Sequence, residues 1–396
     1  MAKKSVVLGV CGGIAAYKAL DVVSRLVKQN IEVDVIMTNS ATKFVTPLSF
    51  QSLSANEVVV DMFNEPKYWE IQHISLAKKA DLMVIVPATA NVIGKVANGI
   101  ADDMLSTTIM ATKAPVIFAP AMNTNMYENP IVQNNIEKLK SFGYDFIEPC
   151  SGRLACGDTG RGKLEDTEVI TECILSRLNE SKDLKGKKVL VTAGPTIAKL
   201  DPVRFITNRS TGKMGYAIAE EARDRGANVV LVSGPTSLKK PYGVNIINVN
   251  TNEEMLNVVL ENFHDSDIVI KSAAVADYKP KNYSNKKIKK GEGDLNIVFE
   301  RDSDILKTLG DNKSNQILVG FAAESNDLLE NAREKLKRKN LDYIVANDIT
   351  SNDTGFATDD NKVTIIGEDK SIVSLEKMCK KSVARELFNI INNKKR

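Results

Sequence analysis

The chain has 396 residues, of which 43% are hydrophobic and 26% are charged, and its formal net charge is +3. This length is enough for about two or three domains that each bury a core. The small net charge does not indicate a nucleic-acid partner or an anionic membrane surface, and no apolar run is long enough to span a membrane. Five cysteines without regular spacing and only two histidines argue against a disulfide framework, a His-rich metal site and a conventional Ser-His-Asp hydrolase. We therefore expect a cytoplasmic protein with no nucleic-acid or membrane partner.

The first half of the chain alternates between short apolar runs and helical patterns. The first run is followed by Gly12-Gly13 and then by a helical pattern through Lys28. This alternation predicts a parallel sheet with helices on both faces, in which ligands bind beyond the carboxyl ends of the strands. Strands are expected at Val6–Val10, Val33–Met37, Leu82–Val86 and Val116–Ala119.

Small or polar residues follow each of these strands. A tight turn explains Gly12-Gly13 as well as a phosphate site does, because the G-x-G-x-x-G fingerprint is incomplete, and helix capping explains the hydroxyl groups around Ser40. Four such loops at one edge of a sheet nevertheless favour a pocket for a phosphorylated, ring-bearing ligand. The candidate cofactor-binding residues are Gly12, Gly13, Ser40, Pro87, Ala88, Thr89, Asn91, Ser106 and Met122.

Two further features could carry chemistry. His73 is one of only two histidines, and a lone histidine is more often a packed or surface residue than a catalyst. Residues 151–162 read SGRLACGDTGRG, and this density of glycine predicts a mobile flap around Cys156. A cysteine on a flap is expected to be accessible and able to act as an acid or a nucleophile.

His73, PATAN at 87–91, PAMN at 120–123 and ACGD at 155–158 together resemble the flavin-dependent cysteine decarboxylase family. The resemblance implies that FMN binds at the four loops and serves as the electron sink that lets a carboxylate leave as CO2. It also implies that Cys156 donates a proton in the reduction, that His73 serves the oxidative decarboxylation, and that Asn123 holds the substrate carboxylate.

The strand-and-helix pattern restarts after a polar, charged stretch. We expect a linker at 183–188 between a decarboxylase domain at 1–182 and a second domain at 189–396, each with a Rossmann-like parallel sheet and helices on both faces. Strands of the second domain are expected at Val189–Thr192, Asn228–Val232, Ile268–Lys271, Ile317–Gly320 and Tyr343–Ala346.

Two loops of the second half indicate anion binding. Residues 192–215 form a long Gly-, Thr-, Asn- and Arg-rich stretch that ends at a helix start but lacks a Walker A pattern. Residues 279–290 hold six lysines. Their spacing alone favours a solvated loop, and a clamp for a triphosphate is the alternative.

DPVRFITNRSTGKMG, AAVADY, KIKK, GFAAES and KRKNLDYIVAND follow one another in the order typical of phosphopantothenate–cysteine ligases. With the first half, the chain resembles the family of bifunctional phosphopantothenoylcysteine decarboxylases and phosphopantothenate–cysteine ligases of coenzyme A synthesis. The resemblance implies that CTP activates 4′-phosphopantothenate as an acyl cytidylate and that the amine of L-cysteine then attacks it. The decarboxylase would convert the resulting 4′-phosphopantothenoylcysteine into 4′-phosphopantetheine and CO2.

The same resemblance assigns residues of the second half. Asn208 and Arg204 would handle the acyl cytidylate, and Lys287 the triphosphate. Mg2+ is expected to accompany the triphosphate, and its protein ligands are not identifiable from the sequence. The remaining residues of the CTP site would be Ser272, Ala273, Asp277, Ser303, Asp304, Ile305, Leu306, Phe321, Lys335 and Lys339.

The family resemblance also implies a homo-oligomer, with trimeric contacts between flavin domains that complete the FMN site and dimeric contacts between ligase domains. Two other functions fit the sequence less well. A nicotinamide oxidoreductase with duplicated Rossmann domains lacks its G-x-G-x-x-G fingerprint and the acidic residue that follows it. A regulatory flavoprotein without activity is disfavoured because His73, Cys156, Asn208 and Lys287 are all present.

Overall fold

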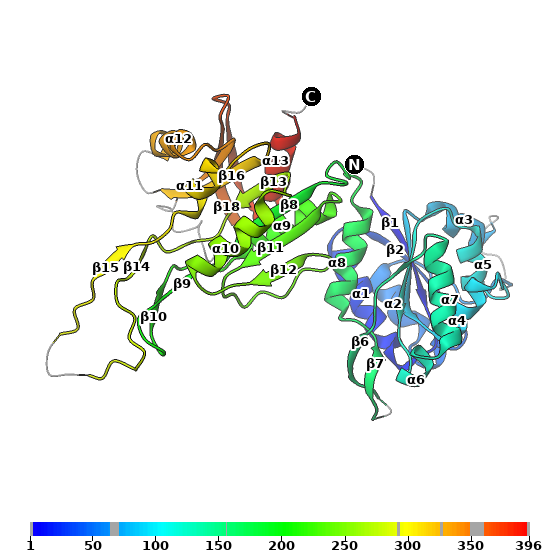
Figure 1. The fold of residues 1–396 in the computed structure, drawn as a ribbon. Coiled ribbons are helices and arrows are strands. Elements are labelled where there is room, and N and C mark those ends of the chain that lie inside the picture. Colours follow the sequence, from blue (N-terminus) through cyan, green and yellow to red (C-terminus); the bar gives the residue numbers. More distant parts are fainter. Residues whose placement is uncertain are drawn as a thin grey trace. The chain divides into compact units, whose positions relative to one another are not determined.

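The computed structural model describes residues 3–63, 71–155, 157–290, 294–324, 328–348 and 360–393 (Figure 1). The chain divides into two compact units, Met1–Asn179 and Glu180–Arg396. Leu184 is buried in the core of the second unit, and its backbone N–H donates to the carbonyl of Arg225. Part of the stretch 183–188, which was expected to be a linker, therefore packs against the core of the second unit. The domain limits expected at 182 and 189 stay a prediction.

The first unit contains a parallel sheet with the strand order β2-β1-β3-β4-β5. Its central strands are buried from end to end, as continuous apolar runs of a sheet covered on both faces should be. The four strands expected from the sequence are all present. The strands are β1 (Ser5–Val10), β2 (Glu32–Met37), β3 (Leu82–Ala88), β4 (Val116–Pro120) and β5 (Asp145–Phe146).

The helices of this unit use amphipathic faces to cover the sheet. In α1 the buried residues are Ala19, Val22, Val23 and Leu26, which form one stripe. Helices α4, α5 and α7 share a core with the sheet, and α1 packs against α8. The elements are η1 (Ile14–Tyr17), α1 (Lys18–Lys28), η2 (Ala41–Lys43), α2 (Pro47–Ser54), α3 (Gln72–Lys79), α4 (Ala90–Ala97), α5 (Met104–Ala111), α6 (Thr124–Tyr127), α7 (Pro130–Ser141), α8 (Thr167–Leu178) and the antiparallel pair β6 (Cys150–Arg153) and β7 (Thr159–Lys163).

The second unit is built on an eight-stranded sheet with the order β12-β11-β8-β13-β16-β17-β18-β19. The strands from β12 to β17 are parallel, but β18 pairs antiparallel with both β17 and β19. The parallel sheet expected for this unit is confirmed, and two antiparallel strands that were not expected extend it at this edge. The strands are β8 (Lys188–Ala193), β11 (Asn228–Ser233), β12 (Asn245–Asn248), β13 (Ile268–Lys271), β16 (Ile317–Glu324), β17 (Tyr343–Asp348), β18 (Asp360–Gly367) and β19 (Ile372–Cys379).

Helices cover both faces of this sheet. One face carries α9 (Lys213–Asp224) and α13 (Lys380–Asn393), and the other carries α10 (Asn252–Phe263), α11 (Ile305–Asp311) and α12 (Leu328–Arg338). Two small antiparallel pairs project from the body of the unit, as Figure 1 shows: β9 (Ile197–Lys199) with β10 (Phe205–Thr207), and β14 (Tyr278–Pro280) with β15 (Phe299–Arg301). Strand order reverses between β8 and β13, which is the position where such sheets bind ligands.

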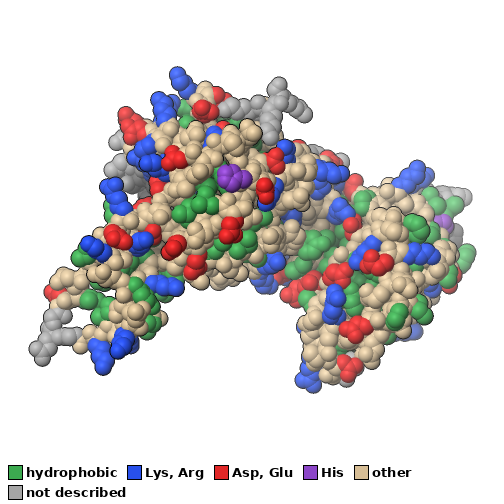
Figure 2. Space-filling view, viewed as in Figure 1, with side chains coloured by type: hydrophobic (Ala, Val, Ile, Leu, Met, Phe, Trp, Pro, Cys, Tyr) green, Lys and Arg blue, Asp and Glu red, His purple; other side chains and the backbone are tan. Residues whose placement is uncertain are grey.

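The surface of each unit carries both signs of charge. Figure 2 shows Lys and Arg side chains interspersed with Asp and Glu side chains over the visible face of each unit. This mixture agrees with the small net charge of the sequence. In the described parts of the chain, no helix combines the length and the hydropathy that a membrane span requires.

Candidate active sites

A cavity of about 880 Å³ lies at the carboxyl ends of the strands of the first unit. The loops after β1, β2, β3 and β4 all line it, together with the β6–β7 flap. The structure thus brings together residues that are far apart in the sequence. The predicted site residues that line this cavity are Gly12, Gly13, Ser40, Thr89, Asn91, Met122 and Asn123.

Two glycines shape the floor of the cavity. A Cβ atom on Gly12 would lie 2.3 Å from Cβ of Ser40 and 2.8 Å from the Ser40 backbone carbonyl carbon, so the loop after β2 can approach only a glycine. A Cβ atom on Gly13 would meet only a methyl group of Thr89, at 3.9 Å. The space above Gly13 is therefore open to a ligand, and the backbone of this turn is exposed to it.

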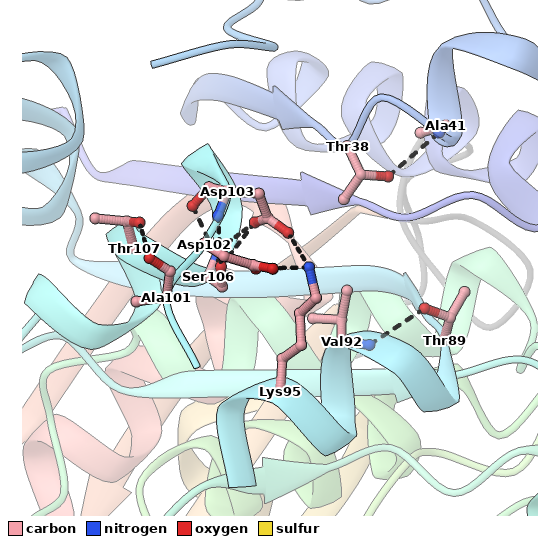
Figure 3. A network of polar contacts seen from close by, with 10 residues as sticks. All are labelled: Thr38, Ala41, Thr89, Val92, Lys95, Ala101, Asp102, Asp103, Ser106 and Thr107. Carbon is pink, nitrogen blue, oxygen red and sulfur yellow. Dashed lines mark hydrogen bonds and ion pairs between the residues drawn. The ribbon is translucent and has the colours of Figure 1, made fainter. Parts of the chain in front are cut away.

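Lys95 and Asp103 also line this cavity, and sequence reasoning missed both (Figure 3). Lys95 Nζ lies 2.6 Å from Asp102 Oδ1 and 2.8 Å from Asp103 Oδ2. Burial alone would raise the pKa of Asp103, but hydrogen bonds from Lys95 and Ser106 outweigh it and hold that pKa below its ordinary value. The sequence feature that could have identified Asp103 is its position directly before a helix, where an acidic side chain caps the first turn.

The flap is joined to the loop after β4. Asn123 is the N-cap of α6: its Oδ1 accepts a hydrogen bond from Asn125 N (2.9 Å), and its Nδ2 donates to Asp158 Oδ2 (2.9 Å). Met122 N donates to the carbonyl of Gly162 (3.0 Å). The carboxamide of Asn123 is thereby oriented at the rim of the cavity. Cys156 lies outside the described residues.

Other predicted residues of the first unit lie elsewhere. Ser106 is fully buried in the capping box of α5: its N–H and its hydroxyl donate to Oδ1 of the N-cap residue Asp103 (2.8 Å each), and its Oγ accepts from Asp103 N (3.2 Å). Pro87 and Ala88 are buried within β3, ahead of the loop that lines the cavity. His73 is a partly buried residue of α3 and does not line the cavity. Cys11 does line it, and burial raises the pKa of its thiol to about 12, which keeps that thiol protonated.

A second cavity, of about 310 Å³, lies at the carboxyl ends of β13, β16 and β17 in the second unit. The N-terminal ends of α9 and α11 open onto it and direct backbone N–H groups toward it. The predicted residues that line it are Asn208, Ser272, Ala273, Asp277, Ser303, Asp304, Ile305, Leu306, Phe321, Lys335 and Lys339.

The long loop that starts after β8 docks onto the loop that follows β13. Asn208 Nδ2 donates to the carbonyl groups of Ala274 (3.2 Å) and Val275 (3.0 Å). Ala273 N in turn donates to Oγ1 of Thr192, at the end of β8 (3.1 Å). These bonds hold Asn208 beside the cavity, next to the loop that follows β13, where strand order reverses.

Arg204 and Lys287 do not line this cavity. Arg204 Nη2 donates to the carbonyl of Ile288 (2.8 Å), and Ile288 N donates to Oδ2 of Asp201 (3.1 Å). Lys287 is exposed directly beside this junction. The two predicted residues are thus on loops that are tied to each other, outside the second cavity.

Lysine side chains give the second cavity a positive character. Lys339 Nζ lies 2.9 Å from Oδ2 of Asp304, which caps α11. Burial would raise the pKa of Asp304, but hydrogen bonds from Lys339 and from Lys307 N lower it. Lys271, which sequence reasoning missed, donates from Nζ to the carbonyl of Ala273 (2.8 Å). Burial, followed by repulsion from Lys339, lowers the pKa of Lys271 to about 8.

The lining residues that were not predicted also include Asn347, Asn361 and Lys380. The sequence could have identified Asn347, because this residue lies in the KRKNLDYIVAND stretch at the end of an expected strand. Asn361 and Lys380 depend on the antiparallel strands β18 and β19, which the sequence pattern did not reveal. Among the residues with described positions, no cluster of three or more His, Cys, Asp or Glu side chains could hold a metal ion.

Comparison with known proteins assigns a family to each unit. Residues 1–179 match the Flavoprotein family, and residues 184–394 match the DNA/pantothenate metabolism flavoprotein C-terminal domain. The coenzyme A biosynthesis bifunctional protein CoaBC of Bacillus subtilis (strain 168) is 51% identical over 391 residues, which are 98% of this chain and 96% of that protein. The CoaBC protein of Escherichia coli (strain K12) is 44% identical over 373 residues, 93% of this chain and 92% of that protein. A crystal structure of the C-terminal domain of a CoaBC protein is 46% identical, with a TM-score of 0.46, and covers 53% of this chain and 96% of that chain. The chain therefore belongs to the CoaBC family of bifunctional coenzyme A biosynthesis proteins.

Proposed function

We propose that the chain catalyses two consecutive steps of coenzyme A biosynthesis. In the second unit, CTP activates 4′-phosphopantothenate as an acyl cytidylate, and the amine of L-cysteine displaces CMP. In the first unit, FMN-dependent decarboxylation converts 4′-phosphopantothenoylcysteine into 4′-phosphopantetheine and CO2. The observation that carries the proposal is that each family match coincides with one unit, and that each unit has its own cavity at the carboxyl ends of its strands.

The residues of the first cavity fit a flavin mononucleotide. Its volume of about 880 Å³ is within the range of cofactor pockets. The open turn at Gly13 and the hydroxyl groups of Ser40 and Thr89 suit a phosphate, and Met122 and Met126 offer soft apolar surface for a ring. FMN supplies an electron sink beside the thiol-bearing carbon, which lets the carboxylate leave, and it supplies the hydride for the later reduction.

Asn123 is suited to bind the substrate carboxylate, because its carboxamide is already oriented by Asn125 N and Asp158. The proton-donor role of Cys156 remains a prediction from the family resemblance. His73 does not line the cavity of its own chain, so it would act on FMN held by a neighbouring copy of a trimer. Trimeric flavin units and dimeric ligase units are part of the proposal.

The second cavity suits a nucleotide triphosphate. Lys335 and Lys339 provide positive charge, and the N-termini of α9 and α11 provide backbone N–H donors for phosphate oxygens. Mg2+ would arrive with the triphosphate, since this ion is held largely by phosphate oxygens and water. Asn208 would orient the acyl cytidylate from its place beside the cavity, and Arg204 and Lys287 would act from the adjoining loops.

The first experiment is a visible spectrum of the purified protein, followed by incubation with 4′-phosphopantothenate, L-cysteine, CTP and Mg2+. We expect a flavin spectrum together with pyrophosphate, CO2 and 4′-phosphopantetheine, identified by mass. A colourless protein that still forms 4′-phosphopantothenoylcysteine would overturn the proposal for the first unit. A coloured protein that releases no pyrophosphate would overturn it for the second.

Replacing Lys287 by glutamine should abolish ligation and leave the flavin bound. Lys287 is exposed beside the junction of the 201–204 loop with Ile288, where its ammonium group can move onto a bound triphosphate. Pyrophosphate release should fall at least about a hundredfold, as for other electrostatic contacts to a transition state. Lys281→Gln, an exposed lysine of the same loop, is the matched control, and loss of flavin colour in Lys287→Gln would contradict the separation of the two sites.

A further inference from the structure

Asp201 is a buried carboxylate for which the activities above provide no role. It lies in the turn 200–204 that joins β9 to β10, only 2% of its surface is exposed, and it lines neither of the two cavities described above. Burial of a carboxylate is unfavourable unless hydrogen bonds or opposite charges compensate for it. The partners of its two oxygens therefore show what this residue holds in place.

The two oxygens of Asp201 hold two different segments. Oδ1 accepts hydrogen bonds from Val203 N (2.8 Å) and Arg204 N (2.8 Å), which close the turn that contains Asp201 itself. Oδ2 accepts from Ile288 N (3.1 Å), in the lysine-rich segment 281–290 that follows β14. Burial alone would raise the pKa of Asp201, but these hydrogen bonds outweigh it and hold that pKa below its ordinary value. The acceptor is therefore an anion at neutral pH, and a hydrogen bond to it is stronger than one to a neutral group.

Ile288 is held through both of its backbone groups. Its N–H donates to Asp201, and its carbonyl accepts from Arg204 Nη2 (2.8 Å). Arg204 Nε lies 3.9 Å from Asp201 Oδ2, so the two side chains that hold Ile288 also form an ion pair. Side chains of the turn thus give Ile288 the two backbone hydrogen bonds that a neighbouring strand would otherwise give.

The lysine-rich segment is also tied to the same turn at Ser284. Ser284 N donates to the carbonyl of Leu200 (3.1 Å), and Ser284 Oγ donates to the carbonyl of Lys286 (2.6 Å). Residues 285–287 are therefore anchored to the turn at both ends. Their two lysine side chains are nevertheless exposed. The turn fixes the backbone of these lysines and leaves their ammonium groups in solvent.

A fixed backbone decides where an exposed lysine can place its charge. The lysine side chain is long and flexible, so its ammonium group reaches one point reliably only if its backbone does not move. A charge that is already in position stabilises the transition state without reorganisation during the reaction. We propose that Asp201 is a positioning residue of the ligase, which holds Ile288 so that Lys287 can reach the triphosphate. The inference rests on the proposed ligase function and on the role of Lys287 in it.

The alternative is that Asp201 only shapes its own turn, and Asp201→Asn distinguishes the two roles. The asparagine Oδ1 can still accept from Val203 N and Arg204 N, which preserves the turn. Its Nδ2 would face Ile288 N, and two donors cannot form a hydrogen bond with each other. We expect the exchange of labelled pyrophosphate into CTP, at saturating CTP with 4′-phosphopantothenate present and cysteine absent, to slow at least about tenfold.

Two further variants show whether the effect passes through Ile288 and Lys287. Ile288→Pro removes the N–H from the other side of the same hydrogen bond and should slow the exchange as Asp201→Asn does. In a chain that already carries Lys287→Gln, adding Asp201→Asn should slow the exchange by less than about twofold more, because the lysine to be positioned is gone. Equal slowing in both backgrounds, or normal exchange in Ile288→Pro, would overturn the proposal.

Tryptic cleavage measures directly whether the backbone is held. The bond between Lys287 and Ile288 is the one whose N–H donates to Asp201, whereas Lys281 is exposed in the same segment. With the Lys281–Asn282 bond as internal reference and the fragments identified by mass, the Lys287–Ile288 bond should be cleaved at least about tenfold faster in Asp201→Asn than in the unaltered chain. An equal rate would show that the carboxylate does not hold this segment.

Asp369→Asn is the matched control, because Oδ1 of Asp369 accepts from Ser371 N (3.1 Å) within an exposed turn between β18 and β19. The exchange and the cleavage at Lys287 should both be unchanged in this variant. If the unaltered chain shows no pyrophosphate exchange, the ligase function itself fails, and the cleavage comparison still tests whether Asp201 holds Ile288. If the unaltered chain shows exchange and the Asp201→Asn chain matches it, only the positioning role fails.

Discussion

A chain in which Gly12 is replaced by alanine should lose its flavin and still ligate cysteine. The new methyl group would lie 2.3 Å from Cβ of Ser40 and 2.8 Å from its backbone carbonyl carbon, so the loop after β2 must move. Such overpacking costs about 1–3 kcal/mol, and here the strain falls on a loop that lines the cavity. We expect flavin affinity to fall at least about tenfold, which is the effect of roughly 1.4 kcal/mol. Equilibrium dialysis against FMN, followed at the visible absorbance band, measures it.

Gly94→Ala is the control for this change. Gly94 lies inside α4, and its added Cβ would meet only Asn135 Nδ2, at 3.7 Å, which is an ordinary contact. The reciprocal variant is Gly215→Ala, whose Cβ would lie 2.5 Å from Cβ of Ala193 and 2.9 Å from the carbonyl oxygen of Thr192. It should impair ligation and leave flavin bound. Equal loss of both activities in either variant would show that the two units do not function separately.

The parts of the fold that were predictable are those set by local pattern. In the first unit, continuous apolar runs and glycine turns predicted the central strands, and the rule that ligands bind at carboxyl ends placed Gly12, Ser40, Thr89 and Asn123 together. Strands β18 and β19 were missed. They lie next to each other at the edge of the sheet, and β19 is largely exposed, so neither follows the buried β-α-β pattern.

Several predicted site residues do not line the cavities, and the reason is of a different kind. A motif groups residues by sequence, whereas a cavity groups them by position in space. Ser106 belongs to a hydroxyl-rich stretch, but in the structure it completes the capping box that Asp103 forms at the start of α5. Arg204 and Lys287 belong to family motifs, but they lie on loops joined at Ile288. Lys271 was missed because a lysine that ends an apolar strand looks like a solvated strand terminus.

Binding of CTP should take up a proton near pH 8.5, and Lys271→Met should remove that uptake. Burial, and then repulsion from Lys339, lowers the pKa of Lys271 from 10.5 to about 8, so its amine is mostly neutral at this pH in the free protein. A bound triphosphate favours the charged form and raises this pKa. The affinity for CTP should therefore fall as pH rises above about 8, by up to about tenfold per pH unit.

Calorimetry of CTP binding in Tris and in HEPES measures this uptake, because the two buffers release their protons with different enthalpies. Lys271→Arg is the informative partner variant, since arginine stays charged throughout this range. It should also show no proton uptake, and its affinity for CTP should stay constant between about pH 7.5 and pH 9. Binding enthalpies that are equal in the two buffers for the unaltered chain would contradict the role of Lys271.

The same pKa predicts how Lys271 affects stability. Below about pH 8 the lysine is charged in both states, and its burial destabilises the folded chain. Between about pH 8 and 10.5 the unfolded chain binds more protons than the folded chain, so the free energy of unfolding rises with pH in this window. Lys271→Met should therefore raise the free energy of unfolding of the ligase unit at pH 7, and the gain should shrink as pH approaches 10. Urea unfolding followed at several pH values tests this, and a gain that grows with pH would show that the buried charge is not the cause.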